Sequence, residues 1–367
     1  MSVESGTDES ERTAESATHH PGSRDYERAP LLVTWEVTQA CELACDHCRA
    51  DAAPDRDPAE LSLEEARDLF ADIAAFEPTP LLVLSGGDPL MRPDLFELLA
   101  DATAAGLTPS VTPATTPRLT RSVIDRLADA GVGRMALSLD GATPDRHDGF
   151  RGEPGTFQRT LRAARAAADV GLPIQINTTV TGGTVDQLPA IAELVRDLDA
   201  AMWEVFFLVP IGRGAALEQL APNRARAVLE WLDDHARSAP YRVITVEAPF
   251  FRRVAMERTP DGERPRHVGS TGAGKGFVFV SHTGEVYPSG FLPQSVGNVR
   301  ERSLRECYRS APLMRRLRDR EAFQGPCGDC AATEICGGSR SRAYAETADP
   351  LASDPLCPWA RSGASRE

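Results

Sequence analysis

The fold of this 367-residue chain is constrained most by a regular alternation of short apolar runs with longer amphipathic stretches. Short runs rich in Val, Ile and Leu are typical of buried strands, whereas apolar residues spaced three or four apart are typical of helices. We predict strands at residues 31–37, 81–84, 107–111, 134–139, 174–180 and 203–209. We predict helices at residues 62–76, 94–105, 122–130, 156–170, 185–198 and 223–236. Ser62 and Glu65 have the spacing of a capping box at the start of the first helix.

This alternation predicts a parallel sheet, because each helix carries the chain back over the sheet by a right-handed crossover. We expect an α/β fold, a partial (β/α)6 TIM-like barrel over residues 30–240, followed by a small cysteine-rich α+β domain over residues 241–367. In barrels of this kind the chemistry gathers at the C-terminal ends of the strands. Residues 1–29 are polar and without apolar periodicity, which predicts a disordered acidic tail.

Three cysteines, Cys41, Cys45 and Cys48, follow the first predicted strand. A [4Fe-4S] cluster bound by protein alone needs four cysteine ligands, so three thiolates on one loop leave one iron open. An open coordination position is where a small molecule can bind and react, as on a catalytic zinc ion. Zinc is the weaker interpretation of the loop, because His47 lies inside the last gap rather than at the spacing of a zinc knuckle.

Four further cysteines are grouped near the C-terminus: Cys327, Cys330, Cys336 and Cys357. Four thiolates complete either a tetrahedral zinc site or a second, closed [4Fe-4S] cluster, and their chemistry alone does not separate these two. Cys307 lies in an amphipathic stretch and is predicted to be a buried small apolar residue rather than a ligand.

The composition of the chain predicts where in the cell it is located and which classes of partner it does not bind. The first 29 residues contain no apolar segment like that of a signal peptide, so we disfavour disulfides and predict a reducing, cytoplasmic location. No apolar stretch is long enough to span a membrane, and we expect no membrane partner. The net charge is -14 and Lys275 is the only lysine, which argues against the basic stripe of a nucleic-acid-binding protein.

The cysteine loop resembles the Cys-x3-Cys-x2-Cys loop of the radical S-adenosyl-L-methionine (SAM, also written AdoMet) enzymes. After the second strand, Gly86-Gly87-Asp88-Pro89 is similar to the Gly-Gly-Glu-Pro segment with which that family contacts the amino group of SAM. Asp88 stands where Glu is commoner in the family. After the fourth strand, Ser138 and Asp140 are similar to the family's Ser-x-Asp-Gly segment near the SAM ribose and carboxylate.

Each of these segments also has an ordinary interpretation. A Gly-Gly pair after a strand is usually a tight turn, and Asp140 is suited to a helix cap or an Asx turn. The resemblance adds Asn177, on the fifth strand, to the expected SAM contacts. Thr112, Thr115 and Thr179 are further candidates for the lining of the site.

The C-terminal cysteines resemble the SPASM extension of radical SAM enzymes, or its shortened twitch form. A full SPASM extension holds two auxiliary clusters, but Ser289 and Arg340 stand here where cysteines for the first cluster are expected. The resemblance therefore implies one auxiliary [4Fe-4S] cluster, on Cys327, Cys330, Cys336 and Cys357.

The resemblance also implies an activity. A reduced cluster cleaves SAM to a 5'-deoxyadenosyl radical, the radical removes a hydrogen atom from the substrate, and the auxiliary cluster takes an electron, so that the substrate is oxidised overall. A donor such as ferredoxin or flavodoxin is expected. The nearest branch includes tetrapyrrole-modifying enzymes of heme biosynthesis, in which a propionate of iron-coproporphyrin is decarboxylated. Candidate propionate ligands are Arg151, Arg213, Arg252 and Arg253, each of which is otherwise an ordinary surface cation.

Two alternatives stay open at this point. One is the maturation of a ribosomal peptide, and the other is a non-catalytic iron-sulfur or zinc scaffold or electron carrier. His147 and His282 are candidate proton carriers, although a lone His in a loop more often faces solvent.

Overall fold

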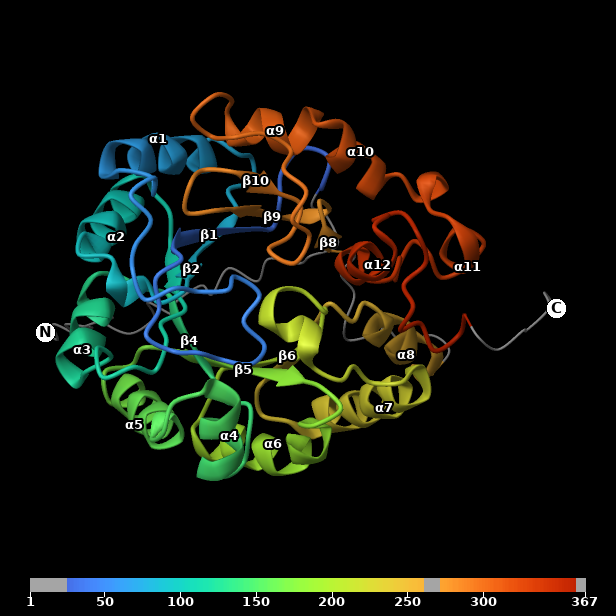
Figure 1. Cartoon of the computed structure of the whole chain (residues 1–367), viewed down its shortest axis with the longest axis horizontal. Helices are drawn as coiled ribbons and strands as arrows, with labels where there is room; N and C mark the ends of the chain where they lie inside the picture. Colours follow the sequence, from blue (N-terminus) through green and yellow to red (C-terminus); the bar gives the residue numbers. More distant parts are fainter. Residues whose placement is uncertain (1–24, 261–270, 361–367) are drawn as a thin grey trace, which may run out of the picture.

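The computed structural model describes residues 25–260 and 271–360. In Figure 1, strands form a curved sheet in the interior and helices follow one another around its outer side. The strands are β1 (Leu32–Thr38), β2 (Leu81–Gly86), β3 (Pro109–Val111), β4 (Arg134–Ser138), β5 (Ile174–Val180), β6 (Met202–Phe207), β7 (Arg242–Val246), β8 (Gly272–Ala273), β9 (Gly276–Val280) and β10 (Val286–Tyr287).

The helices of the barrel part are α1 (Leu63–Ala74), α2 (Leu95–Ala104), α3 (Arg121–Asp129), α4 (Pro144–Arg151), α5 (Thr156–Asp169), α6 (Leu188–Asp197), α7 (Pro222–Ser238) and α8 (Phe250–Glu257). Those of the C-terminal part are α9 (Leu304–Ser310), α10 (Pro312–Arg318), α11 (Gly325–Gly328) and α12 (Arg340–Thr347). Short 3-10 helices are η2 (Pro89–Met91), η3 (Val185–Gln187), η4 (Gly212–Ala216) and η5 (Arg320–Ala322). The capping box of Ser62 and Glu65 is present at the start of α1.

The sheet has the order β10-β9-β1-β2-β3-β4-β5-β6-β7. Every neighbouring pair from β1 to β7 is parallel, which confirms the predicted partial barrel. The sheet continues past residue 240 at both edges: β7 pairs with β6, and β9 pairs in parallel with β1. The predicted domain boundary therefore falls before the end of the sheet, and the C-terminal part contributes strands to it.

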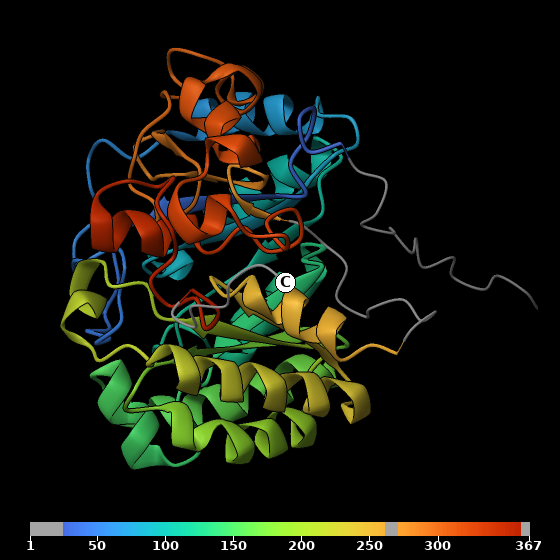
Figure 2. The ribbon, with the colours of Figure 1, turned by 90° about the vertical axis from the view of Figure 1, so that its right-hand side faces the viewer.

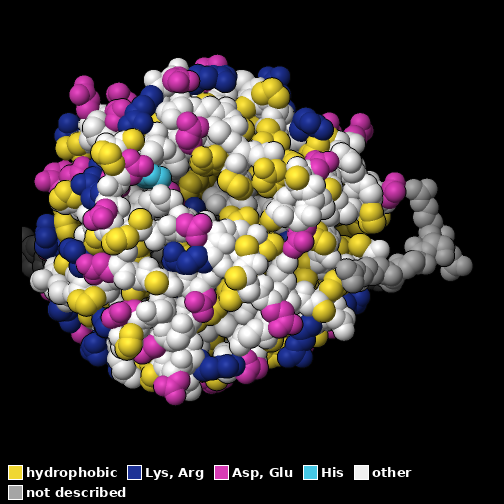
Figure 3. All heavy atoms as spheres, in the orientation of Figure 1, with side chains coloured by type: hydrophobic (Ala, Val, Ile, Leu, Met, Phe, Trp, Pro, Cys, Tyr) yellow, Lys and Arg dark blue, Asp and Glu magenta, His cyan; other side chains and the backbone are white. Residues whose placement is uncertain are grey.

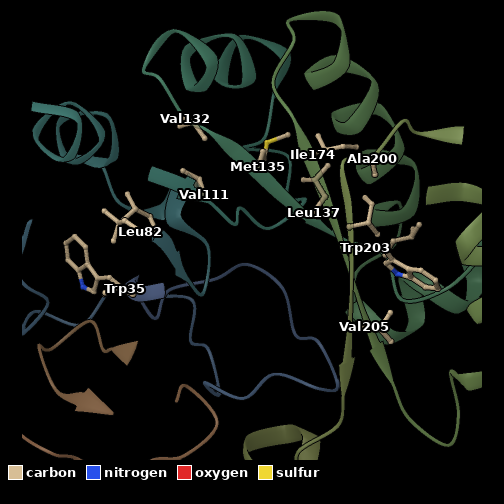
Figure 4. Packing of buried hydrophobic residues seen from close by; sticks show 14 of the residues in the cluster. Trp35, Leu82, Val111, Val132, Met135, Leu137, Ile174, Ala200, Trp203 and Val205 are labelled. Carbon is tan, nitrogen blue, oxygen red and sulfur yellow. The ribbon is translucent and has the colours of Figure 1, made fainter. Parts of the chain in front are cut away.

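The core lies between the strands and the surrounding helices. Figure 4 shows buried side chains such as Trp35, Leu82, Leu137 and Trp203, which extend from β1, β2, β4 and β6. The Trp35 ring packs edge-on against Phe70 of α1, with 5.7 Å between the ring centroids. This apolar packing holds the strand ends, and the residues that follow them, in fixed positions.

The first described residues are packed rather than disordered. Tyr26 and Ala29 are buried, and the Tyr308 hydroxyl donates a hydrogen bond to the Tyr26 carbonyl at 2.7 Å. The predicted disordered tail of residues 1–29 is therefore wrong for residues 25–29, because their apolar side chains pack against the C-terminal part. Residues 1–24 lie outside the described residues. Among residues 25–260 and 271–360, no helix has the length and apolarity needed to cross a membrane.

Candidate active site

A cavity of about 200 Å³ lies at the C-terminal ends of the barrel strands. In Figure 3, hydrophobic side chains gather near the centre of this face of the molecule, and charged side chains of both signs are spread around them. The lining contains the three loop cysteines together with Gly86, Gly87, Ser138, Asp140 and Asn177. It also contains Thr112 and Thr179. The structure thus brings together residues that the sequence places on five different strands or strand ends.

Not every predicted lining residue reaches the cavity. Thr115 is buried and accepts a hydrogen bond from the Thr160 hydroxyl at 3.1 Å instead. Asp88 is fully buried and also absent from the lining. Its carboxylate accepts hydrogen bonds from the Ala114 backbone N–H at 3.2 Å and the Thr116 hydroxyl at 3.1 Å. Burial raises the pKa of Asp88 to about 6 despite these donors. The Asp88 carboxylate joins the segment after β2 to the segment after β3, outside the cavity lining, and a contact of this segment with SAM stays a prediction.

The glycine pair is required by a close approach of the chain to itself. The Gly87 N–H donates to the Thr38 carbonyl at 2.8 Å, and the Asp88 N–H donates to the Ala40 carbonyl at 2.7 Å. A Cβ on Gly86, whose φ is +151°, would lie 2.2 Å from the Thr38 oxygen, and one on Gly87 would lie 2.3 Å from the Ala40 oxygen. Only glycine allows this contact. The end of β2 is thereby held against the residues that lead into the cysteine loop.

The loop itself carries three free thiols at the cavity. Cys41 and Cys45 are buried and Cys48 is half-buried. Burial raises the pKa of the Cys41 thiol to about 12, so its thiolate needs a compensating positive charge, such as bound iron. All eight cysteines are free.

Asp140 and Arg151 form a buried ion pair beside this loop. An Arg151 Nη atom lies 2.8 Å from an Asp140 carboxylate oxygen, and another donates to the Cys45 sulfur at 3.5 Å. The other Asp140 oxygen accepts from the Thr179 N–H at 2.7 Å. Burial opposes ionisation of Asp140, but Arg151 holds its pKa below the usual value. Arg151 therefore connects a carboxylate at the end of β4 to a sulfur of the cysteine loop.

His147 is part of this arrangement rather than a solvent-facing proton carrier. It is fully buried on α4, and its Nδ1 accepts a hydrogen bond from the Asp140 N–H at 3.1 Å. Burial lowers the pKa of His147 to about 4, so the ring is neutral near pH 7. The sequence did not predict α4, although Pro144 at its first turn and Gly152 after its end are ordinary helix signals.

Two further arginines line the cavity, and they differ in their partners. Arg49, which the sequence analysis missed, forms an ion pair with Glu36 at 2.9 Å and stacks on Phe279 with 4.4 Å to the ring centroid. Arg213 donates from Nε to the Cys45 carbonyl at 2.9 Å, but its Nη2 is buried without a hydrogen-bond partner. Within the described part of the chain, Arg213 forms no ion pair with a carboxylate.

His282, the second predicted proton carrier, lies behind Arg49. Its Nδ1 is 3.0 Å from Glu36 and its Nε2 is 3.4 Å from Asp57, which is partly exposed. The hydrogen bond with Glu36 raises the pKa of His282. Burial opposes ionisation of Glu36, but Arg49 and His282 hold its pKa below the usual value. His282 therefore supports the position of Arg49 and does not line the cavity.

The four C-terminal cysteines form a second, separate site around α11 and the segments that flank α12. Burial, together with the neighbouring Cys357 and Cys327 thiols, raises the pKa of Cys336 to about 12. Cys327 is buried, and Cys330, Cys336 and Cys357 are half-buried. In neither site are three or more Cys, His, Asp or Glu side chains spaced to hold a single metal ion, as far as residues 25–260 and 271–360 show. Four thiols at one site match the full ligand set of a closed [4Fe-4S] cluster.

Arg252 and Arg253, which the sequence analysis assigned to propionates, lie at this second site and not in the cavity. Arg252 donates to the Ile335 carbonyl at 3.2 Å, and Arg253 donates to the Cys330 sulfur at 3.6 Å. In both Figure 1 and Figure 2, α8, which carries them, lies beside the C-terminal segments. Neither of these two candidates lines the cavity.

Ser289, predicted to stand in place of a first auxiliary-cluster ligand, belongs to a hydrogen-bond network. It is buried, and its hydroxyl donates to Glu247 at 3.2 Å. The Ser341 hydroxyl donates to the same carboxylate at 2.9 Å. Arg340 is also buried, with its Nη1 on the Ala352 carbonyl at 2.7 Å. Hydroxyl, carboxylate and guanidinium groups fill this region in place of cysteines.

Comparisons with known proteins agree with this geometry. Residues 35–196 match the radical SAM superfamily, and residues 272–331 match SPASM, an iron-sulfur cluster-binding domain. The AdoMet-dependent heme synthase of Methanosarcina barkeri is 38% identical over 340 residues, which cover 90% of this chain and 96% of that protein. The AdoMet-dependent heme synthase of Nitratidesulfovibrio vulgaris is 38% identical over 343 residues, which cover 89% of this chain and 92% of that protein.

A maturase and a solved structure are also similar. The mycofactocin maturase MftC of Mycobacterium ulcerans is 33% identical over 342 residues, covering 90% of this chain and 88% of that protein. The crystal structure of Streptococcus suis SuiB bound to S-adenosylmethionine superposes with a TM-score of 0.72 at 17% identity, covering 90% of this chain and 77% of that one. At this identity the structural likeness concerns the fold alone.

Proposed function

The chain belongs to the radical SAM superfamily, and from that premise we propose that it oxidatively decarboxylates the propionate groups of an iron-coproporphyrin in heme biosynthesis. One observation carries the proposal: a single cavity joins a three-thiol loop, the Gly86-Gly87 turn and the buried Arg213, whose Nη2 has no partner. The relatives that share 38% identity over nearly their whole length are named heme synthases. The chain is an enzyme of the oxidoreductase type, and the scaffold alternative has no support.

We assign Cys41, Cys45 and Cys48 as ligands of a [4Fe-4S] cluster whose open iron binds SAM. When bound, this cluster supplies one electron that cleaves SAM to a 5'-deoxyadenosyl radical. The chain's own residues position the reactants. Gly86 and Gly87 expose backbone groups beside the loop, and Ser138, Asp140 and Asn177 offer hydroxyl, carboxylate and amide groups for the ribose and methionine parts of SAM.

Other residues of the cavity lining suit a flat, carboxylated substrate. Phe206 and Phe291 both line the cavity, with 6.4 Å between their ring centroids, and offer apolar surface to a macrocycle. A propionate would pair with the guanidinium of Arg213, because a guanidinium matches a carboxylate and this one has only carbonyl partners, those of Cys45 and Ala52, with its Nη2 left without a partner. Arg151 is less suited to this role, since Asp140 already neutralises it.

In the proposed reaction, each propionate loses a hydrogen atom, carbon dioxide and one electron and becomes a vinyl group. Loss of a hydrogen atom from the β-carbon leaves a carbon radical, which then releases carbon dioxide and one electron and forms the vinyl double bond. Cys327, Cys330, Cys336 and Cys357 would hold the auxiliary [4Fe-4S] cluster that takes this electron. A one-electron donor such as ferredoxin or flavodoxin would reduce the loop cluster, and a reducing cytoplasm would preserve both clusters.

Peptide maturation is the second candidate, because a peptide maturase is 33% identical over 88% of its length. We rank it below heme synthesis, because the heme synthases are more similar over a larger part of their chains.

An anaerobic turnover tests the proposal. Protein with both clusters is mixed with SAM, dithionite and iron-coproporphyrin III, and 5'-deoxyadenosine and porphyrin mass are followed together. We expect deoxyadenosine and stepwise loss of carbon dioxide and hydrogen from two propionates. The variant Arg213→Gln should raise the KM for the porphyrin by roughly tenfold or more, as expected for loss of a charged hydrogen bond. Deoxyadenosine with an unchanged porphyrin would overturn the substrate and favour a peptide.

A further inference from the structure

Guanidinium groups surround the four-cysteine site. Two of them contact sulfur: Arg340 donates from Nη2 to Cys327 at 3.6 Å, and Arg253 donates from Nη1 to Cys330 at 3.6 Å. Two more are close enough to interact electrostatically with these cysteines, Arg252 with Cys336 and Arg320 with Cys336 and Cys327. This cationic environment is unusual for a chain whose net charge is -14.

The two donors to sulfur are held in place by other contacts. Arg340 is buried and anchored from Nη1 to the Pro350 and Ala352 carbonyls at 3.1 Å and 2.7 Å. Arg253 pairs with Glu257 at 2.7 Å and stacks on Trp359 with 4.2 Å to the ring centroid. Their positions at the sulfur atoms are therefore set before any cluster binds.

The nearby buried carboxylate does not cancel these charges. Asp354 interacts electrostatically with Cys336 and Cys357, but it is already paired with the fully buried Arg342 at 3.0 Å. Backbone donors add to the arginines: the Ala332 N–H lies 3.4 Å from the Cys330 sulfur, and the Gly338 N–H is hydrogen-bonded to Cys336.

The cysteine loop at the cavity has a different environment. Within residues 25–260 and 271–360, one guanidinium, that of Arg151, donates to a loop sulfur, and its charge is neutralised by Asp140. The Leu43 N–H also lies 3.4 Å from the Cys41 sulfur, so the two sites differ in their guanidinium groups and not in their backbone donors. The Asp88 carboxylate acts on the Cys41 thiol with the opposite sign. A reduced iron-sulfur cluster carries one more negative charge than its oxidised form, so cations and hydrogen bonds at sulfur favour reduction.

We propose that Arg253 and Arg340 are positioning residues that raise the reduction potential of the auxiliary cluster above that of the loop cluster. The inference rests on the proposed function. When the substrate radical loses carbon dioxide and its carbon–carbon double bond forms, the one electron that it releases would then reduce the auxiliary cluster. The arginines thereby direct the second electron away from the cluster that cleaves SAM.

The potential of the auxiliary cluster can be measured without substrate. In the Cys45→Ser background, which lacks a loop ligand, a redox titration followed by electron paramagnetic resonance reports the auxiliary cluster alone. Arg253→Gln should reduce the equilibrium constant for cluster reduction by about tenfold, which lowers the midpoint by about 59 mV. The Arg253→Lys variant keeps the charge but not the planar guanidinium, so its midpoint should lie between those of the protein with Arg253 and of Arg253→Gln.

Arg226→Gln is the matched control. Arg226 lies 5.1 Å from the centroid of the same Trp359 ring, 3.9 Å from the same Glu257 and 2.8 Å from Glu230, and among the described residues it donates to no sulfur atom. Its removal should leave the midpoint unchanged. An Arg253→Gln midpoint equal to that of the control overturns the inference alone. Absence of any cluster in the Cys45→Ser protein overturns it together with the assigned ligands. An unreactive porphyrin with a shifted midpoint overturns only the proposed substrate.

Discussion

The three-cysteine loop and the four-cysteine site bind the same kind of cluster in our assignment, yet their surroundings differ. The loop lies at the wall of a cavity, and the one guanidinium that contacts its sulfur is neutralised by Asp140. At the second site, two arginines without carboxylates of comparable burial contact sulfur. This difference fits the two roles that we propose. The first site is open and binds a ligand, and the second is closed and electrostatically suited to accept an electron.

The largest expected effect separates the two sites by their iron. Cys45→Ser should reduce the iron content from about eight to about four atoms per chain and abolish deoxyadenosine formation, because the open iron is lost. Cys307 is fully buried and assigned no ligand role, so Cys307→Ala should retain the iron. Iron and sulfide analysis with a deoxyadenosine assay checks both. Residual cleavage of SAM by Cys45→Ser would contradict the assignment of the loop.

Loss of the second site should uncouple the reaction instead of stopping it. Cys357→Ser removes an auxiliary ligand, so vinyl product should fall by about a hundredfold while SAM is still cleaved. The ratio of deoxyadenosine to vinyl product measures this directly. An unchanged ratio would show that the electron leaves the substrate by another route.

A smaller effect concerns the ion pair beside the loop. Asp140→Asn leaves the buried Arg151 without its carboxylate, and it should lower the free energy of unfolding by about 3–5 kcal/mol. Asp186→Asn removes the surface partner of Arg146, where the cost should be about 0–1 kcal/mol. Urea denaturation of the protein with both clusters compares them. Equal losses would show that Arg151 finds solvent when Asp140 is neutralised.

The smallest expected effect is a pH dependence of protein stability that arises at His282, beside Glu36 and Asp57. The pKa of His282 is raised in the folded state by Glu36, then by Asp57. Its stabilisation is therefore full below the unfolded pKa of about 6.5 and is lost as the pH rises through the higher folded pKa. Wild type should lose stability relative to His282→Gln over that range. The midpoint of the auxiliary cluster should show no such step, since arginines stay charged. A matching step there would contradict the separation of the two sites.

The fold was largely predictable because its periodicity is local. Apart from α4, the strands and α-helices from residue 31 to residue 236 follow from apolar spacing. Helix α4 was missed because Pro144–Arg151 buries only His147 and Phe150, too few side chains to give a helical period. Strand β7 was missed because Arg242–Val246 is a short strand at the sheet edge with a single fully enclosed residue, Val243.

The site was predictable where it depends on contiguous motifs. Cys41, Gly87 and Asp140 each occur in a short segment with a recognisable spacing. Arg49 was missed because its partners come from the strand before it and from Phe279, which is far away in the chain. Arg253 was misplaced for the same reason: only the packing of α8 beside the C-terminal part shows which site it faces.

The pairing of β9 with β1 affects how the chain is made. Strand β1 is the first to leave the ribosome, but the register of Leu32 with Phe277 forms only after some 240 further residues have been synthesised. Until then, one edge of β1 has unpaired backbone groups, which is the kind of edge that joins other chains. We therefore expect a truncated chain ending before Gly276 to aggregate, and the cell to benefit from supplying iron-sulfur clusters only after the last strand has closed the edge.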